Sequence, residues 1–246
     1  MGDRAVYCAR LESVCALIGT RGSNPRPSAT LALVVLLIGL AGTAAAQSPS
    51  TRINPIDSAQ RAYQSGKLDE AFAILDDAEK RGIRTAKTLD IRGRALMEQG
   101  KYAEAIQAFQ AAQQTDPIVF GRQNIGDALM RQKRFEEARA AYQAASKTSN
   151  VLVVNERLRF GTLLSYLGMM DEEGAQQALD ALPFPTETAA YYYAQAAWAF
   201  AHGNTREGRK WIARAESIHK PRSRAWFARH LYEFGWLKKK PPLTLE

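Results

Sequence analysis

The sequence predicts an all-α protein built from repeated helix pairs, and three observations lead to this fold class. One turn motif occurs three times, as Gly66–Ala71, Gly100–Ala105 and Lys133–Ala138. The alanines that end these motifs are 34 and 33 residues apart (105 − 71 and 138 − 105), close to the ~34-residue period of helix-turn-helix repeats. Apolar and small residues recur with the helical period, and no stretch after residue 46 shows a sustained alternation with a period of two.

Each repeat also carries a fixed pattern of large and small side chains. A large residue occupies one position of the second helix of each pair: Leu75, Phe109 and Tyr142. A small residue occupies one position of the first helix: Ala59, Gly93 and Gly126. Small side chains let two helices cross closely, while a large one fills the space beside them. We therefore expect these two sets to contact each other.

These positions resemble the tetratricopeptide repeat. The middle repeat, Ala86 to Ile118, carries the most matches, in the family's order: Leu89, Gly93, Leu96, Tyr102, Ala105, Phe109, Ala112 and Pro117. Arg92 departs from the pattern, because the family prefers Leu there. The resemblance implies a right-handed α-solenoid of about five helix pairs. It also implies that the first helix of each pair lines a concave groove in which ligands lie.

The expected solenoid covers residues 52–220. Its first three repeats follow the pattern clearly and its last two diverge from it; the five are 52–85, 86–118, 119–150, 151–185 and 186–220. A short linker, 47–51, precedes it. Pro221 begins a last segment, 221–246, which we expect to form a capping helix and a basic tail, since a solenoid needs a terminal unit with one solvated face.

An apolar run, Leu31 to Ala45, follows Arg21 and Arg26. Small residues at 44–46 fit a cleavage site before Gln47, so we interpret residues 1–46 as a secretory signal peptide. This predicts a periplasmic or secreted protein. A retained membrane anchor is the alternative, although ~15 apolar residues fall short of the ~20 that a spanning helix needs.

Both cysteines, Cys8 and Cys15, lie in this leader. The chain after residue 46 therefore has no disulfide, no thiolate metal site and no cysteine nucleophile.

Positive charge is concentrated at the C-terminal end. Residues 47–200 contain 18 basic and 19 acidic residues, a net of −1, whereas residues 201–246 contain 11 and 4, a net of +7. All four tryptophans also lie after residue 197. Three interpretations are open: a packed cap with a solvated basic face, a surface for anionic lipid or cell-wall polymer, and a surface for an acidic protein. We expect the lysines at 238–240 to belong to a frayed tail.

The sequence contains no recognisable catalytic motif. The three histidines, His202, His219 and His230, do not stand at metal-ligand spacing with a carboxylate. The acidic run Asp171 to Glu173 fits a helix start, where negative charge suits the helix dipole. Nucleophile-elbow, phosphate-loop and dinucleotide-binding glycine motifs are absent from the sequence. We expect neither catalysis, nor a metal, nor a cofactor.

The resemblance places polar and adaptable side chains on the groove face of the first helices. The residues predicted to line it are Asp57, Gln60, Tyr63, Asp90, Arg94, Met97, Gln123, Asn124, Asp127, Met130, Arg131 and Arg159. Asn124 stands where family members that clamp a peptide carboxylate have Asn, but Asp90 stands where the clamp has Lys. The resemblance therefore does not imply a complete carboxylate clamp. Methionine side chains adapt to varied ligands, so an extended or helical peptide would suit such a groove.

These features predict a non-enzymatic scaffold or adaptor in the bacterial cell envelope that binds protein segments in its groove. Nucleic acid is not an expected partner of an exported protein. The alternative is an attachment protein whose basic, aromatic C-terminal region binds anionic lipid or cell-wall polymer. The sequence leaves the oligomeric state open.

Overall fold

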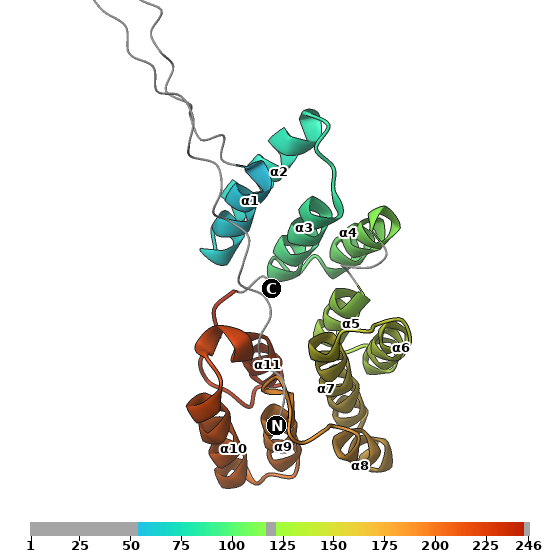
Figure 1. Cartoon of the computed structure of the whole chain (residues 1–246), viewed down its shortest axis with the longest axis vertical. Coiled ribbons are helices and arrows are strands. Elements are labelled where there is room, and N and C mark those ends of the chain that lie inside the picture. The colour runs from blue at the N-terminus through green and yellow to red at the C-terminus, as the bar shows by residue number, and fades with distance from the viewer. Residues whose placement is uncertain (1–53, 117–121, 244–246) are drawn as a thin grey trace, which may run out of the picture. The chain divides into compact units, whose positions relative to one another are not determined.

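The computed structural model describes residues 54–116 and 122–243. The predictions for the signal peptide, the linker at 47–51 and Pro117 lie outside these residues. Within them the protein forms eleven α-helices and no strand, which confirms the all-α prediction (Figure 1). The helices are α1 (Pro55–Gln64), α2 (Leu68–Lys80), α3 (Ala86–Glu98), α4 (Tyr102–Thr115), α5 (Arg122–Arg131), α6 (Phe135–Ser146), α7 (Leu152–Met169), α8 (Glu172–Asp180), α9 (Ala190–Ala201), α10 (Thr205–Ile218) and α11 (Pro221–Glu233).

Helices α1 to α10 form five consecutive pairs, each an antiparallel hairpin of neighbouring helices. The second helix of each of the first four pairs also contacts the first helix of the next pair. First helices contact one another as well, α1 with α3, α5 with α7 and α7 with α9. These nearest-neighbour contacts make an all-α solenoid of helical repeats.

Tight turns with a left-handed residue end several first helices. Gly100 has a φ of 76°, its N–H bonds to the carbonyl of Met97, and the N–H of Lys101 bonds to the carbonyl of Leu96. This arrangement satisfies carbonyls that a helix end leaves without partners. In the third repeat Lys133 takes the same conformation, with a φ of 59°. The repeat geometry is thus kept where the sequence lacks the glycine.

The small and large positions of the repeats contact each other as predicted. A Cβ added to Gly93 would lie 2.5 Å from Phe109, and one added to Gly126 would lie 2.5 Å from Tyr142. Both rings are fully buried. Tyr142 also lies against Gly161 of the next first helix, so a single ring joins α5, α6 and α7.

The helix start predicted at Asp171 is confirmed, and other local features follow the same chemistry. The side chain of Asn54 caps α1, and Asp171 caps α8 by accepting from the N–H of Gly174. The aromatic run that begins at Tyr191 is helical. None of the helices in the described ranges is long and apolar enough to span a membrane.

We expect Gly93→Ala to destabilise the fold. Alanine is favoured over glycine in a helix by about 1 kcal/mol, but overpacking a filled core typically costs about 1–3 kcal/mol, and the ring of Phe109, which the new Cβ would meet at 2.5 Å, is fully buried. Urea denaturation measures the change in free energy of unfolding. The same substitution in a Phe109→Leu background is expected to cost less; an equal cost in both backgrounds would show that the close approach is not the cause.

Candidate interaction groove

Helix α11 packs against the last helix pair and also against first helices far from it in sequence. It contacts α9 and α10, as a terminal cap does. Its Phe227 and Leu231 are fully buried, and the ring of Phe227 meets that of Phe160 of α7 edge-on, with centroids 5.3 Å apart. A second face of α11 bears polar side chains that reach α3 and α5. We call the surface of α1, α3 and α5 that faces α11 the inner groove.

Asp127 of α5 is the central carboxylate of the inner groove and is buried. Tyr142 donates its hydroxyl to Oδ1 at 2.7 Å, Trp226 donates its indole N–H to Oδ2 at 3.1 Å, and His230 Nε2 lies 3.3 Å from Oδ1. Burial disfavours ionised Asp127, but His230 and the two hydrogen bonds outweigh it, so the pKa of Asp127 is lowered. Burial likewise disfavours charged His230, and the charge of Asp127 outweighs it, so the pKa of His230 is raised.

A second carboxylate, that of Glu98 at the end of α3, belongs to a side chain that is only 6% exposed and binds three cations. Its oxygens lie 3.0 Å from Arg131, 2.5 Å from Arg229 and 3.4 Å from Lys240. Glu233 of α11 completes the cluster, 2.8 Å from Arg131 and 3.6 Å from Arg229. Burial raises the pKa of Glu98, but Arg131 and Arg229 overcome this effect and the pKa is lowered. Because α3, α5, α11 and the tail supply these charges, the cluster joins four segments.

A third polar group lies further along α3. Arg94 pairs with Asp90 at 2.8 Å, and the amide of Asn124 donates to the other oxygen of Asp90. Burial disfavours the charge of Arg94, but Asp90 outweighs it and the pKa of Arg94 is raised. The carbonyl oxygen of Asn124 is buried and has no hydrogen-bond partner among the described residues.

Two cavities flank the Glu98 cluster. The larger, about 610 Å³, opens between the ends of α3, α5, α7 and α11. Its lining combines charged residues with Met97, Met130, Phe135 and Phe234. The smaller, about 30 Å³, lies between Tyr63 and Trp226. Its small size means that α11 and the tail nearly fill this part of the inner groove.

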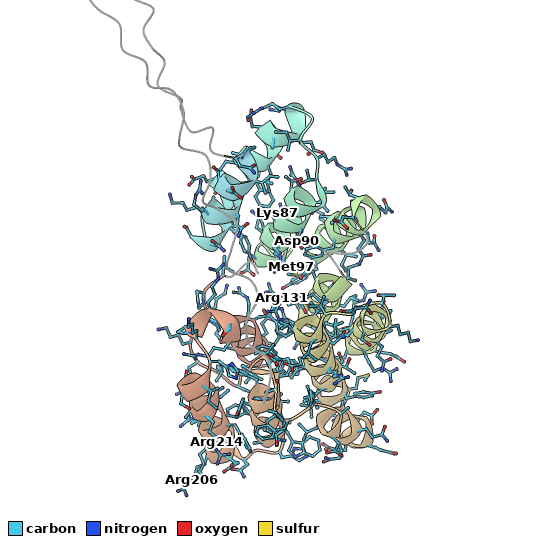
Figure 2. The ribbon with its side chains drawn as sticks, in the orientation of Figure 1. Lys87, Asp90, Met97, Arg131, Arg206 and Arg214 are labelled. Atoms are coloured by element: carbon cyan, nitrogen blue, oxygen red, sulfur yellow. The ribbon has the colours of Figure 1, made fainter. Side chains whose placement is uncertain are left out.

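Most of the predicted groove residues come together, but α11 and the tail cover them. Those that are buried are Tyr63, Asp90, Met97, Asn124, Asp127 and Met130. Those that are partly buried are Gln60, Arg94, Gln123 and Arg131. Asp57 and Arg159 are exposed and lie outside the network. Figure 2 shows Lys87, Asp90 and Met97 in succession along α3, with Arg131 at the end of α5. The role of these residues in binding a partner remains a prediction.

Sequence reasoning missed the residues that occupy the inner groove. Arg229 and His230 follow Trp226 by three and four residues, and Glu233 follows them by four and three, which places all four on one side of α11. That spacing was a readable signal for a polar stripe, but nothing in the sequence connects the stripe with Asp127 or Glu98. Lys240, expected in a frayed tail, instead reaches Glu98.

The histidines give a second example of contacts that the sequence does not reveal. Nothing in the sequence connects His230 with Asp127 or His202 with Glu172, yet the fold brings the first pair to 3.3 Å and the second to 3.0 Å. Among the described residues, no three His, Cys, Asp or Glu side chains gather as metal ligands would.

The contribution of His230 to stability is expected to fall as pH rises. Its pKa is higher in the folded state than the ordinary value of 6.5, so its ion pair with Asp127 is fully present below about pH 6.5 and is lost as pH rises through the folded value. Asp127 stays ionised throughout this range because its pKa is lowered. Glu233 is the other carboxylate that favours charged His230.

Urea denaturation of the full chain and of His230→Gln between pH 5.5 and 8.5 measures this effect. The difference in free energy of unfolding between the two proteins should be largest at the acidic end and shrink toward the alkaline end. A difference that is constant across the range would contradict an ionised His230–Asp127 pair.

Comparisons with known proteins agree with this architecture. Residues 56–117 and 124–150 match the model of the tetratricopeptide repeat family. No curated protein matched the sequence. The crystal structure of a thermophilic tetratricopeptide-repeat protein from Thermus thermophilus is similar to this chain, with a TM-score of 0.55 and 18% identity. The similarity covers 73% of this chain and 98% of the other. The chain thus resembles the tetratricopeptide repeat in sequence over the first three helix pairs, and its fold is that of a tetratricopeptide-repeat protein.

Proposed function

We propose that the protein is an exported scaffold that binds segments of other proteins along its inner groove. Tetratricopeptide repeats are a protein-interaction architecture, and the observation that carries the proposal comes from this chain itself. Side chains of α3 and α5, including Glu98, Asp127 and Arg131, bind a helix and a tail of polypeptide through hydrogen bonds and ion pairs. A surface that binds a segment of its own chain has the chemistry to bind a similar segment of another protein.

The groove remains accessible to a partner at the N-terminal ends of α1 and α3. Asp57 and Lys87 form an exposed ion pair between α1 and α3, with the two charged atoms 3.8 Å apart. Gln60 lies one turn further along α1 and is half-buried. Export to the periplasm or beyond, and a role as an adaptor in the cell envelope, follow from the apolar leader and are part of the proposal.

Site-specific photo-crosslinking in cells that produce the full chain tests the groove. A photoreactive side chain at Gln60 is expected to give discrete protein adducts. The matched control places it at Gln110, an exposed position on α4, a second helix, where we expect no such adducts. The same adducts from both positions, or none from Gln60, would contradict binding along the groove.

A second candidate function, attachment to an anionic surface, is favoured by the outer face of α10. Arg206, Arg209 and Arg214 are exposed there, and the Arg214 guanidinium lies 4.4 Å from the ring centroid of Trp211 (Figure 2). Phe184 is 65% exposed. Basic residues beside accessible aromatic side chains suit an anionic lipid surface or cell-wall polymer.

Cosedimentation with phosphatidylglycerol vesicles tests this second function. If it is correct, replacing Arg206, Arg209 and Arg214 by Gln should abolish binding that is also lost at 1 M salt, where the Debye length is ~3 Å. The control replaces three exposed lysines elsewhere, Lys80, Lys101 and Lys147, by Gln and should bind like the wild type. Equal binding by all three proteins, or none by the wild type, would rule out the α10 surface.

A further inference from the structure

The chain turns back after α11 and crosses the inner groove. Gly235 takes a φ of 78°, and the N–H of Trp236 bonds to the carbonyl of Leu231. The Trp236 ring then stacks on Phe234, with centroids 4.7 Å apart, and on Phe200 at 6.0 Å. These contacts anchor the start of the tail, so the residues that follow begin from a fixed point.

Residues Lys240 to Leu243 lie in the groove without regular secondary structure. Lys240 pairs with Glu98 at 3.4 Å, and Arg229 donates to the carbonyl of Pro241 at 3.4 Å.

Pro242 lines the small cavity with Tyr63, Arg94 and Met97. Leu243 then contacts the apolar cluster formed by α1, α2 and α3. The tail therefore passes from the C-terminal end of α3 toward α1.

Each of these four residues fits its surroundings chemically. The side chain of Glu98 is only 6% exposed, and its carboxylate pairs with the cation of Lys240. Pro241 and Pro242 favour the extended polyproline conformation, which loses little conformational entropy on binding. Leu243 adds apolar contact beyond them. The complementarity also has a broader basis, because the C-terminal 46 residues carry +7 and residues 47–200 carry −1.

We infer that the tail is a ligand bound in cis, and that the inner groove takes in trans an extended protein segment in which a cation precedes two prolines and an apolar residue. This inference rests on the proposed function and specifies the partner's chemistry. The tail occupies the same positions that the partner would use: the oxygen of Glu98, the surface of Tyr63 and Met97, and the apolar cluster of the first helix pair. The partner and the tail must therefore compete.

The tail competes well because it is tethered, although its own contacts with the groove are weak. A short tether gives the tail a millimolar effective concentration, so it occupies the groove without high intrinsic affinity. Lys240 is 56% exposed, and its pair with Glu98 is one of the longer pairs in the cluster. A tail of this kind lowers the apparent affinity of a partner without excluding it.

A labelled peptide of residues 236–243 tests the inference by fluorescence anisotropy against full-length proteins. Lys240→Ala combined with Leu243→Ser removes two tail contacts and should tighten peptide binding roughly tenfold relative to the wild type. The control, Lys239→Ala, removes the same charge from an exposed neighbour that forms no ion pair among the described residues, and should bind like the wild type. A peptide of the same composition with its prolines separated should bind more weakly.

Glu98→Gln, added to the tail variant, should reverse the gain, with circular dichroism confirming that the helix content is unchanged. If this variant loses its helices, the inference is still tested by the peptide with separated prolines and by the comparison of the wild type with the Lys240→Ala, Leu243→Ser variant. Equal affinity of the wild type and the tail variant, or equal affinity for both peptides, would overturn the inference. If Gln60 gives crosslinks but the peptide does not bind, this inference is overturned and the proposed function stands. If the peptide binds but Gln60 gives no crosslinks, the proposed function is contradicted.

Discussion

The arrangement of α11 depends on the contacts of one buried carboxylate, that of Asp127. It accepts hydrogen bonds from Tyr142 of α6 and Trp226 of α11 and pairs with His230. A carboxylate of this kind is unfavourable in an apolar interior unless it is paired and hydrogen-bonded, and removing one partner of a buried pair typically costs about 3–5 kcal/mol. Only when α11 is docked does Asp127 have all its partners. The carboxylate therefore links the third repeat with the C-terminal helix 99 residues away.

Glu98 acts in a similar way one repeat earlier, but its environment is less closed. It collects cations from α5, α11 and the tail, and Glu233 balances the two arginines. A cavity of about 610 Å³ adjoins this cluster. Buried ion pairs add little net stability compared with apolar contacts of the same size, but they impose geometry and penalise a wrong partner. This makes the Glu98 region better suited to selecting a segment than to holding the fold together.

The two faces of α11 have different consequences for function. Phe227 and Leu231 belong to the main core, so the helix is a permanent part of the fold. The tail beyond Trp236 has fewer buried apolar contacts, and its Lys240 and Pro241 contact polar atoms of the groove. Local stability follows the density of such contacts. A partner could therefore replace the tail while α11 stays in place.

The sequence by itself determined the repeat, because a helix pair can bury its apolar face only against similar pairs, and that requirement recurs every 33 or 34 residues. It placed Gly93 against Phe109 and Gly126 against Tyr142, and it marked the start of α8. Only the tertiary structure decided what faces the groove. The contacts of Asp127 with Trp226 and of Glu98 with Arg229 join residues 99 and 131 positions apart. No local period encodes such pairs, because they arise from where the solenoid brings its last helix.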